Sequence, residues 1–433
     1  MFGRHRLAFP FCATFLLWLS PAVRPAELTG EGVSGNWQSD APGVRHHIST
    51  EDLPKPYATP SAQNGPNVVA GPEGAVPLVP AAFEIRRYAS GFRNPRKLLT
   101  APNGDIFVAE SEADEIRILR ESKHDGKPDI NRVFLSGLNK PFGLALYPPG
   151  DHPQYLYIGN TDGVVRVPYQ TGDLEARGKT EHITDLSGGG RLRGGGHWTR
   201  DVTFSLDGKK LFASVGSLTN VDQDSAPVEN DRARIFVMNP DGSDKQPFAT
   251  GIRNPVGLAI HPDTGDLWAS VNERDELGDD LVCDYITRVR ENQFFGWPWF
   301  YLGNHPDPRH AKDPHAELAD KVTVPDVLLQ SHSASLNLVF YTGANFPAEY
   351  RHDAFAAFHG SWNRKDRTGY KVIRVPLKDG QPQGVYEDFI TGFVLPDGTV
   401  WGRPVGLTVM KDGGLLMSED GNKTLWKVTA AGK

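Results

Sequence analysis

The chain is poor in cysteine, has no excess of basic charge and contains no hydrophobic run long enough to span a bilayer. Two of its 433 residues are cysteine, and the formal net charge is −7. Nucleic-acid binders normally carry a basic face, so this balance argues against nucleic acid as a partner. The longest apolar run covers residues 7–19, whereas a spanning helix needs about 20 residues. We therefore expect neither a nucleic-acid partner nor a membrane span.

The same N-terminal run has the three parts of a secretory signal. Two arginines precede the apolar residues, and a Ser-Pro-Ala triplet at 20–22 provides a cleavage site. We predict a signal peptide at residues 1–22 and a periplasmic or secreted mature chain; the alternative is a buried N-terminal helix. Cleavage would leave Cys283 as the sole cysteine, so the mature fold would hold without an internal disulfide.

Several catalytic motifs are absent as well. The chain lacks the G-x-S-x-G of serine hydrolases and the H-E-x-x-H of zinc proteases. The glycine-rich stretch 188–196 never reaches the G-x-G-x-x-G spacing of a dinucleotide site, and a strand rather than a helix is expected after it. No C-x-x-C-H motif is present to attach a haem. These absences leave serine hydrolase, zinc protease and dinucleotide chemistry without support.

Turn residues, by contrast, are plentiful, with 46 glycines and 34 prolines. Residues 23–80 are rich in Pro, Gly, Ala and Ser and show little apolar periodicity. This composition predicts a linker or a loosely attached strap. From about residue 82 onward the pattern changes to short alternating strands bounded by Gly, Pro, Asn and Asp.

One unit recurs six times in this second part of the chain. It consists of a polar pair, an apolar strand, a turn with Gly and Asp, and another apolar strand. The spacing, stretched by insertions, is typical of propeller blades of roughly 40–50 residues that stack to bury their strands. We predict an all-β fold in which residues 81–433 form a six-bladed β-propeller catalytic domain; a sandwich or two barrels is the alternative. The copies begin at Arg93, Asn139, His197, Arg253, Ser333 and Gly402.

These starting residues should lie together at one mouth of the central channel, because the first strand of each propeller blade lines that channel. Arginine, lysine and histidine occur there although the chain as a whole is acidic. A confined cluster of cations is costly unless an anion compensates it, which predicts an anionic ligand held by guanidinium groups. Pairing of the arginines with nearby Asp or Glu is the alternative. The residues that follow the six starts are Asn94, Lys140, Trp198, Asn254, Ala334 and Arg403.

His197 is the candidate base at this mouth. It follows the flexible glycine-rich stretch 188–196, and the strand that it begins would direct its imidazole into the channel. Near neutral pH an imidazole can accept a proton from an alcohol or a hemiacetal hydroxyl. A structural histidine bonded to a backbone carbonyl is the alternative interpretation.

An acidic stretch, residues 272–285, follows the start of the fourth copy. Five acidic side chains lie between Glu273 and Asp280, next to the expected cationic mouth. Ca²⁺ takes about six to eight oxygen ligands, including backbone carbonyls, so this loop is a candidate calcium site. Its spacing is not that of an EF-hand, and a solvated acidic turn is the alternative.

In combination, these features resemble the glucose/sorbosone dehydrogenases. The shared motifs are the glycine-rich lead into His197, Ile-Arg-Asn-Pro at 252–255, the acidic stretch, and Gly-Trp-Pro at 296–298. The sorbosone branch is most similar, through APNGDIFVAES (101–111), HGSWNR (359–364) and GYKVIRVPL (369–377). The resemblance implies a secreted six-bladed propeller that oxidises sugars with pyrroloquinoline quinone (PQQ) and Ca²⁺.

The resemblance also implies roles for individual residues. His197 would remove the proton of the sugar's anomeric hydroxyl while a hydride moves to C5 of the quinone. Arg253 and Asn254 would hold the quinone, and Arg403 would lie under its carboxylates. PQQ carries three carboxylates, which makes it a suitable anion for the cationic mouth, and it carries the redox chemistry. Calcium would act as a Lewis acid on the C5 carbonyl.

Six further positions complete the expected site. Asp275 and Glu276 match the pair whose main-chain carbonyls bind calcium in the family. Ser333 is expected to contact the cofactor. Arg364 is expected there as well, because it is the basic residue nearest to the position of the family's cofactor-binding lysine in blade five. The residues expected to contact the sugar are Asn139 and Trp198.

The sequence therefore favours PQQ- and Ca²⁺-dependent oxidation of an aldose or of a sugar aldehyde such as sorbosone. Its partners would be the sugar and an external electron acceptor, a quinone or a cytochrome. A non-enzymatic propeller that binds carbohydrate or protein would keep the fold and leave His197 unused. A Ca²⁺-dependent lactonase is disfavoured, because it needs a cage of Glu, Asp and Asn where cations line this mouth.

Overall fold

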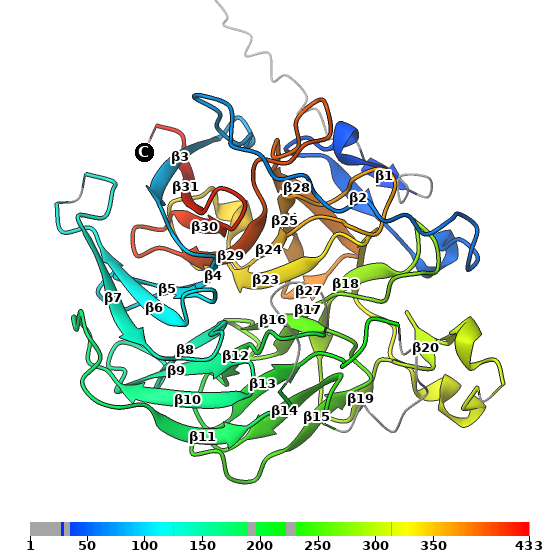
Figure 1. Ribbon diagram of the computed structural model, residues 1–433, viewed down its shortest axis with the longest axis horizontal. Coiled ribbons are helices and arrows are strands. Elements are labelled where there is room, and N and C mark those ends of the chain that lie inside the picture. Colours follow the sequence, from blue (N-terminus) through cyan, green and yellow to red (C-terminus); the bar gives the residue numbers. More distant parts are fainter. Residues whose placement is uncertain are drawn as a thin grey trace, which may run out of the picture.

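In the part of the chain that the structure describes, six large β-sheets surround a central axis and form the blades of a propeller (Figure 1). The computed structural model describes residues 27–29, 35–123, 125–188, 196–221, 231–312 and 314–432. The predicted signal peptide, residues 1–22, and positions 189–195 of the glycine-rich stretch lie outside these ranges. The prediction of an all-β, six-bladed propeller is confirmed. No helix in the described residues is both long and apolar enough to cross a membrane.

The first three blades are antiparallel sheets whose strands follow one another outward from the channel in chain order. The first consists of β4 (Pro95–Thr100), β5 (Ile106–Glu110), β6 (Glu115–Arg120) and β7 (Ile130–Ser136). The second consists of β8 (Gly143–Tyr147), β9 (Tyr155–Asn160), β10 (Gly163–Pro168) and β11 (Glu181–Asp185). The third consists of β12 (Val202–Phe204), β13 (Leu211–Val215), β14 (Arg234–Met238), β15 (Gln246–Thr250) and the short parallel strand β19 (Gln293–Phe294).

The other three blades repeat this plan, so each predicted copy supplies the first two strands of one blade. The fourth consists of β16 (Pro255–Ile260), β17 (Leu267–Val271), β18 (Cys283–Val289) and β22 (Val327–Ser331). The fifth contains β23 (Ser335–Phe340), β24 (Ala354–Phe358), β25 (Lys371–Val375) and β28 (Val385–Ile390). The sixth consists of β29 (Pro404–Val409), β30 (Leu415–Glu419), β31 (Thr424–Ala430) and β3 (Phe83–Ser90).

Short elements decorate the loops between blades. The two-stranded hairpins are β20 (Phe300–Tyr301) with β21 (His305–Pro306), and β26 (Leu377–Lys378) with β27 (Gln381–Pro382). The helical elements of the described residues are 3-10 turns: η2 (Trp37–Ser39), η3 (Thr50–Asp52), η5 (Pro308–His310), η6 (Ala316–Lys321) and η7 (Ala348–Tyr350).

Burial of the second strands explains how the blades hold together. Five of them, namely β5, β13, β17, β24 and β30, are buried along their whole length. Both faces of such a strand lie against neighbouring blades, so apolar and small residues run almost continuously, as in IFVAE and AFAAF. Hydrophobic burial between blades therefore stabilises the ring, since a single blade is too small to form a core of its own.

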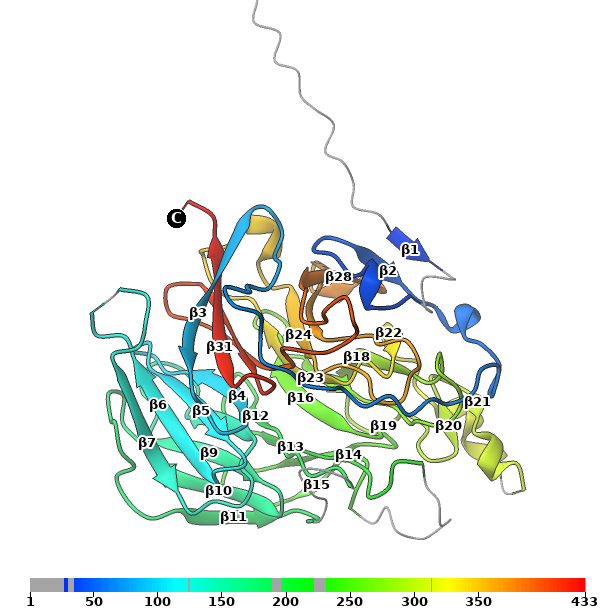
Figure 2. The same cartoon turned by 45° about the horizontal axis from the view of Figure 1, so that its top comes forward.

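The ring is closed by pairing between distant parts of the sequence. β3 forms the outer strand of the last blade and pairs antiparallel with β31 from Phe83↔Ala430 to Ser90↔Thr424. Figures 1 and 2 show the blue β3 beside the red β31. The beginning of the repeat region thus completes the blade formed by its end.

The N-terminal segment before β3 packs onto the propeller and adds two strands to the fifth blade. β2 (Arg45–His47) pairs antiparallel with β28, and β1 (Glu27–Thr29) pairs parallel with β2. Further along, Asn64 and Val69 donate backbone hydrogen bonds to the carbonyl oxygens of Trp362 and Val400. The segment therefore runs from the fifth blade to the sixth (Figure 2).

The centre of the channel is closed by an apolar cluster and a buried ion pair. Nζ of Lys97 lies 2.5 and 2.7 Å from the two carboxylate oxygens of Asp201. The same carboxylate accepts the backbone N–H groups of Val202 (2.9 Å) and Leu258 (2.8 Å), so it joins the first, third and fourth blades. The apolar cluster consists of Phe142, Val256, Leu336 and Val405, with Trp198 packed against it.

We expect Lys97→Met to lower the free energy of unfolding by about 3–5 kcal/mol, because it leaves the Asp201 carboxylate buried without a countercharge. Lys209→Met is the matched control, since Lys209 pairs with Asp207 across an exposed 3.4 Å contact. That surface pair should contribute at most about 1 kcal/mol. Denaturant unfolding of both variants measures the difference, and equal losses would show that the central pair is not a special constraint.

Candidate active site

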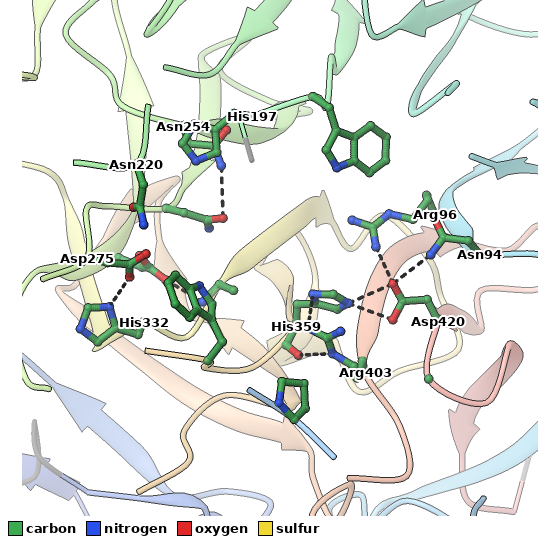
Figure 3. A pocket seen from close by; sticks show the side chains of 18 of the residues that line it. Asn94, Arg96, His197, Asn220, Asn254, Asp275, His332, His359, Arg403 and Asp420 are labelled. Atoms are coloured by element: carbon green, nitrogen blue, oxygen red, sulfur yellow. Dashed lines mark hydrogen bonds and ion pairs between the residues drawn. The ribbon is translucent and has the colours of Figure 1, made fainter. Parts of the chain in front are cut away.

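A pocket of about 930 Å³ lies where the first strands of the blades begin (Figure 3). Residues around the start of a first strand line it, together with the loops between second and third strands. Both kinds of segment lie at the same end of the channel because neighbouring strands of a blade are antiparallel. The lining includes Asn94, Arg96, Glu112, His197, Trp198, Asn220, Arg253, Asn254, Glu273, Asp275, Asp284, His332, His359, Trp362, Arg403, Asp420 and Lys423.

His197 precedes β12 and is held through one ring nitrogen. Its Nδ1 lies 2.9 Å from both the carbonyl oxygen and the hydroxyl oxygen of Ser217. Because a carbonyl can only accept, Nδ1 carries the proton and Nε2 keeps a lone pair. Burial and then the charge of Arg253 lower the pKa of His197 to about 3, so the ring is neutral. The fold thus presents a fixed, unprotonated nitrogen at the pocket.

Arg253 connects two loops beside the pocket. Its Nε and Nη2 donate to the carbonyl oxygen of Asn220 at 3.0 and 2.8 Å. Its Nη1 donates to the carbonyl oxygens of Asn272 (3.0 Å) and Glu273 (2.6 Å). The guanidinium also lies 5.5 Å from the ring centre of Trp297. Arg253 therefore acts on the pocket through its charge and through the loops that it holds.

Asn254 lines the pocket, but its side-chain oxygen is turned into the protein. Its Nδ2 lies 3.4 Å from Oδ1 of Asn272, whereas its own inaccessible Oδ1 has no hydrogen-bond partner within the described ranges. Gly216 leaves the room for this side chain, because a Cβ there would come within 2.3 Å of that oxygen. Asn254 is therefore held in place by close packing against Gly216.

Another wall of the pocket is cationic and is centred on one carboxylate. Asp420 accepts from Nη1 of Arg96 (2.7 Å) and lies 2.9 Å from Nε2 of His359. Nδ1 of His359 in turn lies 2.9 Å from Nη2 of Arg403. Lys423 lines the same wall. Three cations, Arg96, Arg403 and Lys423, line the pocket beside the carboxylates of Asp420 and Glu112, so this side keeps a net positive charge that suits an anion.

A third wall contains buried acids and a paired histidine. Burial raises the pKa of Glu273 to about 8 and that of Asp284 to about 6. Asp275 differs, because its Oδ1 lies 3.0 Å from Nδ1 of His332. Burial opposes ionisation of Asp275, but the hydrogen bond and charge of His332 outweigh it and lower the pKa of Asp275. The carbonyl oxygen of Gly278 engages Nε2 of His332 at 3.0 Å.

These contacts do not fit the calcium site expected at Asp275 and Glu276. The Asp275 carboxylate is paired with His332, and its carbonyl oxygen accepts from Nε of Arg274 at 2.8 Å. Despite burial, the bond to Asp275 raises the pKa of His332, which favours the charged ring. Glu276 is exposed and does not line the pocket. His332 thus engages the carboxylate of Asp275 and Arg274 its main-chain carbonyl oxygen, so a divalent ion would have to displace these partners, and no step is derived through calcium.

Within the described residues, one group of carboxylates and imidazole has metal-like spacing, and it lies outside the pocket. It consists of Asp40, His46 and Asp388. Nζ of Lys371 lies 2.7 Å from both Asp40 and Asp388 and supplies the positive charge that a metal would bring. This cluster is therefore an internal ion-pair network, and it ties the N-terminal segment to the fifth blade.

The structure brings together six of the expected site residues, namely His197, Trp198, Arg253, Asn254, Asp275 and Arg403. Asn139 and Ser333 do not reach the pocket. The exposed Asn139 donates to Asp162 at 2.7 Å. The hydroxyl of the buried Ser333 donates to the carbonyl oxygen of Gln330 at 2.7 Å, while both its chain neighbours line the pocket.

Arg364, the expected cofactor residue of the HGSWNR motif, also lies away from the pocket. Its Nη1 donates to the carbonyl oxygen of Gly35 at 2.7 Å, and its Nη2 pairs with Asp280 at 2.7 Å. The side chain is buried against the N-terminal segment, whose path is not visible in a repeat alignment. The same motif contributes His359 and Trp362 to the pocket instead.

Five chemically important pocket residues were not predicted from the sequence: Arg96, Asn220, His332, His359 and Asp420. Three of them, Asn220, His359 and Asp420, lie in loops between the second and third strands of a blade, whereas the repeat alignment compared only the starts of first strands. These loops could have been predicted to reach the pocket, because an antiparallel second strand must end where the first strand begins. His359 additionally stands in the motif HGSWNR.

With this geometry established, comparison with known proteins defines the family. The chain belongs to the TrAA12-like family, whose model matches residues 77–292 and 300–431. An uncharacterized protein of Borreliella burgdorferi is 30% identical over 367 residues, covering 81% of this chain and 90% of that protein. A pyrroloquinoline quinone-dependent pyranose dehydrogenase of Coprinopsis cinerea is 22% identical over 400 residues, covering 78% of this chain. The match spans about half of that enzyme, 52% of its length.

Solved structures show the same fold. The holo form of the pyranose dehydrogenase PQQ domain from Coprinopsis cinerea has a TM-score of 0.69 at 20% identity, covering 85% of this chain and 100% of that one. The calcium structure of the Trichoderma reesei AA12 enzyme has a TM-score of 0.67 at 18% identity, covering 86% and 99%. The apo aldose sugar dehydrogenase of Escherichia coli has a TM-score of 0.59 at 16% identity, covering 80% and 99%. The expected resemblance to PQQ-dependent sugar dehydrogenases is confirmed.

Proposed function

We propose that this chain is a PQQ-dependent sugar dehydrogenase in which His197 removes the proton of a sugar hydroxyl. The state of His197 carries this proposal: Nδ1 is bonded to Ser217, and Nε2 has no partner in the described ranges. The other two imidazoles of the pocket, His332 and His359, have both ring nitrogens engaged. His197 is thus the pocket imidazole with a nitrogen available to accept a proton.

The composition of the pocket supports PQQ as the cofactor. Its volume of about 930 Å³ lies within the range of about 300–1,000 Å³ for small-molecule sites. Arg96, Arg403 and Lys423 would hold the carboxylates, and Trp198 and Trp362 offer aromatic surfaces to a flat ring system. When bound, PQQ supplies a two-electron acceptor, so a sugar carbon whose hydroxyl loses a proton can also lose a hydride.

The residues around His197 tune its basicity and fix its tautomer. Burial and then the charge of Arg253 hold the pKa of His197 down, and an anion bound nearby would offset that charge and make Nε2 a stronger base. Ser217 keeps the imidazole in one tautomer, so each turnover meets the same nitrogen.

The sequence supports the substrate class, the electron acceptor and the cellular location that we propose. The substrate is an aldose or a sugar aldehyde such as sorbosone. Electrons leave to an external quinone or cytochrome, because the chain has no C-x-x-C-H motif for a haem of its own. The signal pattern at residues 1–22 supports a periplasmic or secreted enzyme, with residues 23–80 as a strap and 81–433 as the catalytic domain.

The alternatives receive less support from the pocket. A Ca²⁺-dependent lactonase needs several free carboxylates around one ion, whereas Asp275 is paired with His332 and Asp420 with Arg96. A non-enzymatic binding propeller has no need for a neutral histidine held in one tautomer with its other nitrogen unbonded. The arrangement of His197 therefore favours an enzyme.

We expect His197→Gln to lower turnover by about 100-fold or more, because the variant loses the proton acceptor while glutamine can still donate to Ser217. Calorimetric titration with PQQ, followed by dye reduction with a panel of aldoses, separates cofactor binding from chemistry. His182→Gln is the control, since His182 is 61% exposed at the side chain. Near-normal turnover with intact PQQ binding would remove His197 from the role of base.

The protonation of His197 provides a second test. Its pKa of about 3 means that the cofactor-free chain keeps the ring unprotonated far below the ordinary histidine value. We therefore expect the imidazole signals of His197 in the cofactor-free chain to stay unchanged as the pH falls from 7 to 5. Nuclear magnetic resonance titration measures this, with His197→Gln to assign the signals and circular dichroism at each pH to confirm folding. Titration of His197 near pH 6.5 would contradict this expectation.

Calcium dependence tests the contacts around Asp275 and Glu276. Because the His332 and Arg274 side chains already engage Asp275, we expect PQQ to bind with the same dissociation constant in EGTA and in added CaCl₂. Calorimetry under both conditions measures the constant, with MgCl₂ as the control for ionic strength. A dissociation constant that falls at least tenfold with Ca²⁺ alone would restore the calcium site implied by the family resemblance.

A further inference from the structure

A single buried carboxylate connects three groups that line the cationic wall of the pocket. Asp420 accepts a hydrogen bond from Nη1 of Arg96 at 2.7 Å and one from Nδ2 of Asn94 at 3.3 Å. Both of its oxygens also face Nε2 of His359, at 2.9 and 3.0 Å. Figure 3 shows these side chains converging on Asp420 from two other blades.

His359 extends this connection to Arg403. Nδ1 of His359 lies 2.9 Å from Nη2 of Arg403. A guanidinium group can only donate, so Nδ1 is the acceptor and the ring proton is on Nε2, facing Asp420. Burial and the charge of Arg403 lower the pKa of His359 to about 4, which agrees with a neutral ring. The chain Asp420–His359–Arg403 therefore has one consistent direction of hydrogen bonds.

The backbone around Asp420 is itself tightly held. Asp420 lies in the turn between β30 and β31 and donates its backbone N–H to the carbonyl oxygen of Arg403 at 3.1 Å. In the same turn, Oε2 of Glu419 accepts the backbone N–H of Asn422 at 2.9 Å, and Oε1 accepts that of Thr424 at 3.0 Å. The carboxylate of Asp420 thus projects from a rigid turn rather than from a mobile loop.

We propose that Asp420 is a positioning residue for the anionic cofactor: it fixes Arg96 directly, and Arg403 through His359, in the orientation that receives carboxylates. This inference rests on the proposed function, because it assigns the cationic wall to PQQ. Both arginines line the pocket.

Charge alone and positioning make opposite predictions for this residue. A negative carboxylate beside the cofactor site opposes an incoming anion, so electrostatics alone would give tighter binding when Asp420 is neutralised. Positioning predicts weaker PQQ binding when Asp420 is neutralised. Arg96 and Arg403 would then be free to move in the unbound protein, and ordering them on binding would cost conformational entropy. The sign of the change therefore decides between the two.

The experiment is a calorimetric titration of the full chain with PQQ at low and moderate ionic strength. We expect Asp420→Asn to raise the dissociation constant by about tenfold or more, as for loss of one charge-assisted hydrogen bond. Glu112→Gln is the charge-matched control, because Glu112 lines the same pocket and carries the same charge. This control should bind PQQ at least as tightly as the parent. Binding by Asp420→Asn as tight as by the control would overturn the proposal.

Two further measurements keep the test independent of folding defects. His359→Phe leaves Asp420 and Arg96 in place but removes the acceptor of Arg403, so it should also weaken PQQ binding. Circular dichroism and thermal unfolding show whether Asp420→Asn and His359→Phe fold. If one of them does not fold, PQQ binding by the other tests the proposal. Unchanged PQQ affinity in a folded variant of either kind would contradict positioning through this chain.

A ligand-free readout separates this proposal from the proposed function. Hydrogen bonds slow the rotation of a guanidinium group, so the Nη signals of Arg96 and Arg403 should be resolved by nuclear magnetic resonance in the parent and merge in Asp420→Asn. If the parent fails to bind PQQ, the proposed function fails, and these signals alone decide whether Asp420 positions the arginines. Signals that are unchanged in Asp420→Asn would overturn the inference even if PQQ binds.

Discussion

Closure of the ring by β3 against β31 is the constraint on which the pocket depends. The pairing joins residues more than 300 positions apart and completes the sixth blade. With the ring closed, the first strands of all blades surround one channel, and their starts meet at one end. Arg96 of the first blade and Asp420 of the last can form a 2.7 Å hydrogen bond only because the two blades are adjacent. The active-site candidate is thus a product of closure as well as of local sequence.

Burial of charge is the second theme of the structure. Lys97 with Asp201, Lys371 with Asp388 and Arg96 with Asp420 are ion pairs in which both side chains are nearly or fully inaccessible. Breaking such a pair leaves an uncompensated charge in a medium of low dielectric constant, so each pair holds its segments in one arrangement. Around the pocket, the same principle sets the protonation of His197 and His359. Both rings are neutral because they are buried beside arginines.

Much of the fold and about half of the site could be predicted before the structure. The blades follow from local alternation and turn residues, which is why all six copies were located correctly. His197, Arg253, Asn254 and Arg403 were found because the starts of equivalent strands converge by symmetry. Arg364 was misplaced because its partners, Gly35 and Asp280, come from segments outside the repeat. No repeat pattern reports where an inserted loop or an N-terminal strap directs a side chain.

The sequence by itself determined the strands, their number and the residue types that reach the channel mouth, since these depend on neighbours along the chain. Only the tertiary structure decided which groups remain free for chemistry. His197 keeps Nε2 unbonded because Ser217 takes Nδ1, whereas His332 and His359 are fully engaged by residues far away in sequence. The same holds for the acidic stretch, where Asp275 is paired with His332, a residue 57 positions further along the chain. Hydrogen-bond partners are assigned by packing in three dimensions, and that information is not local.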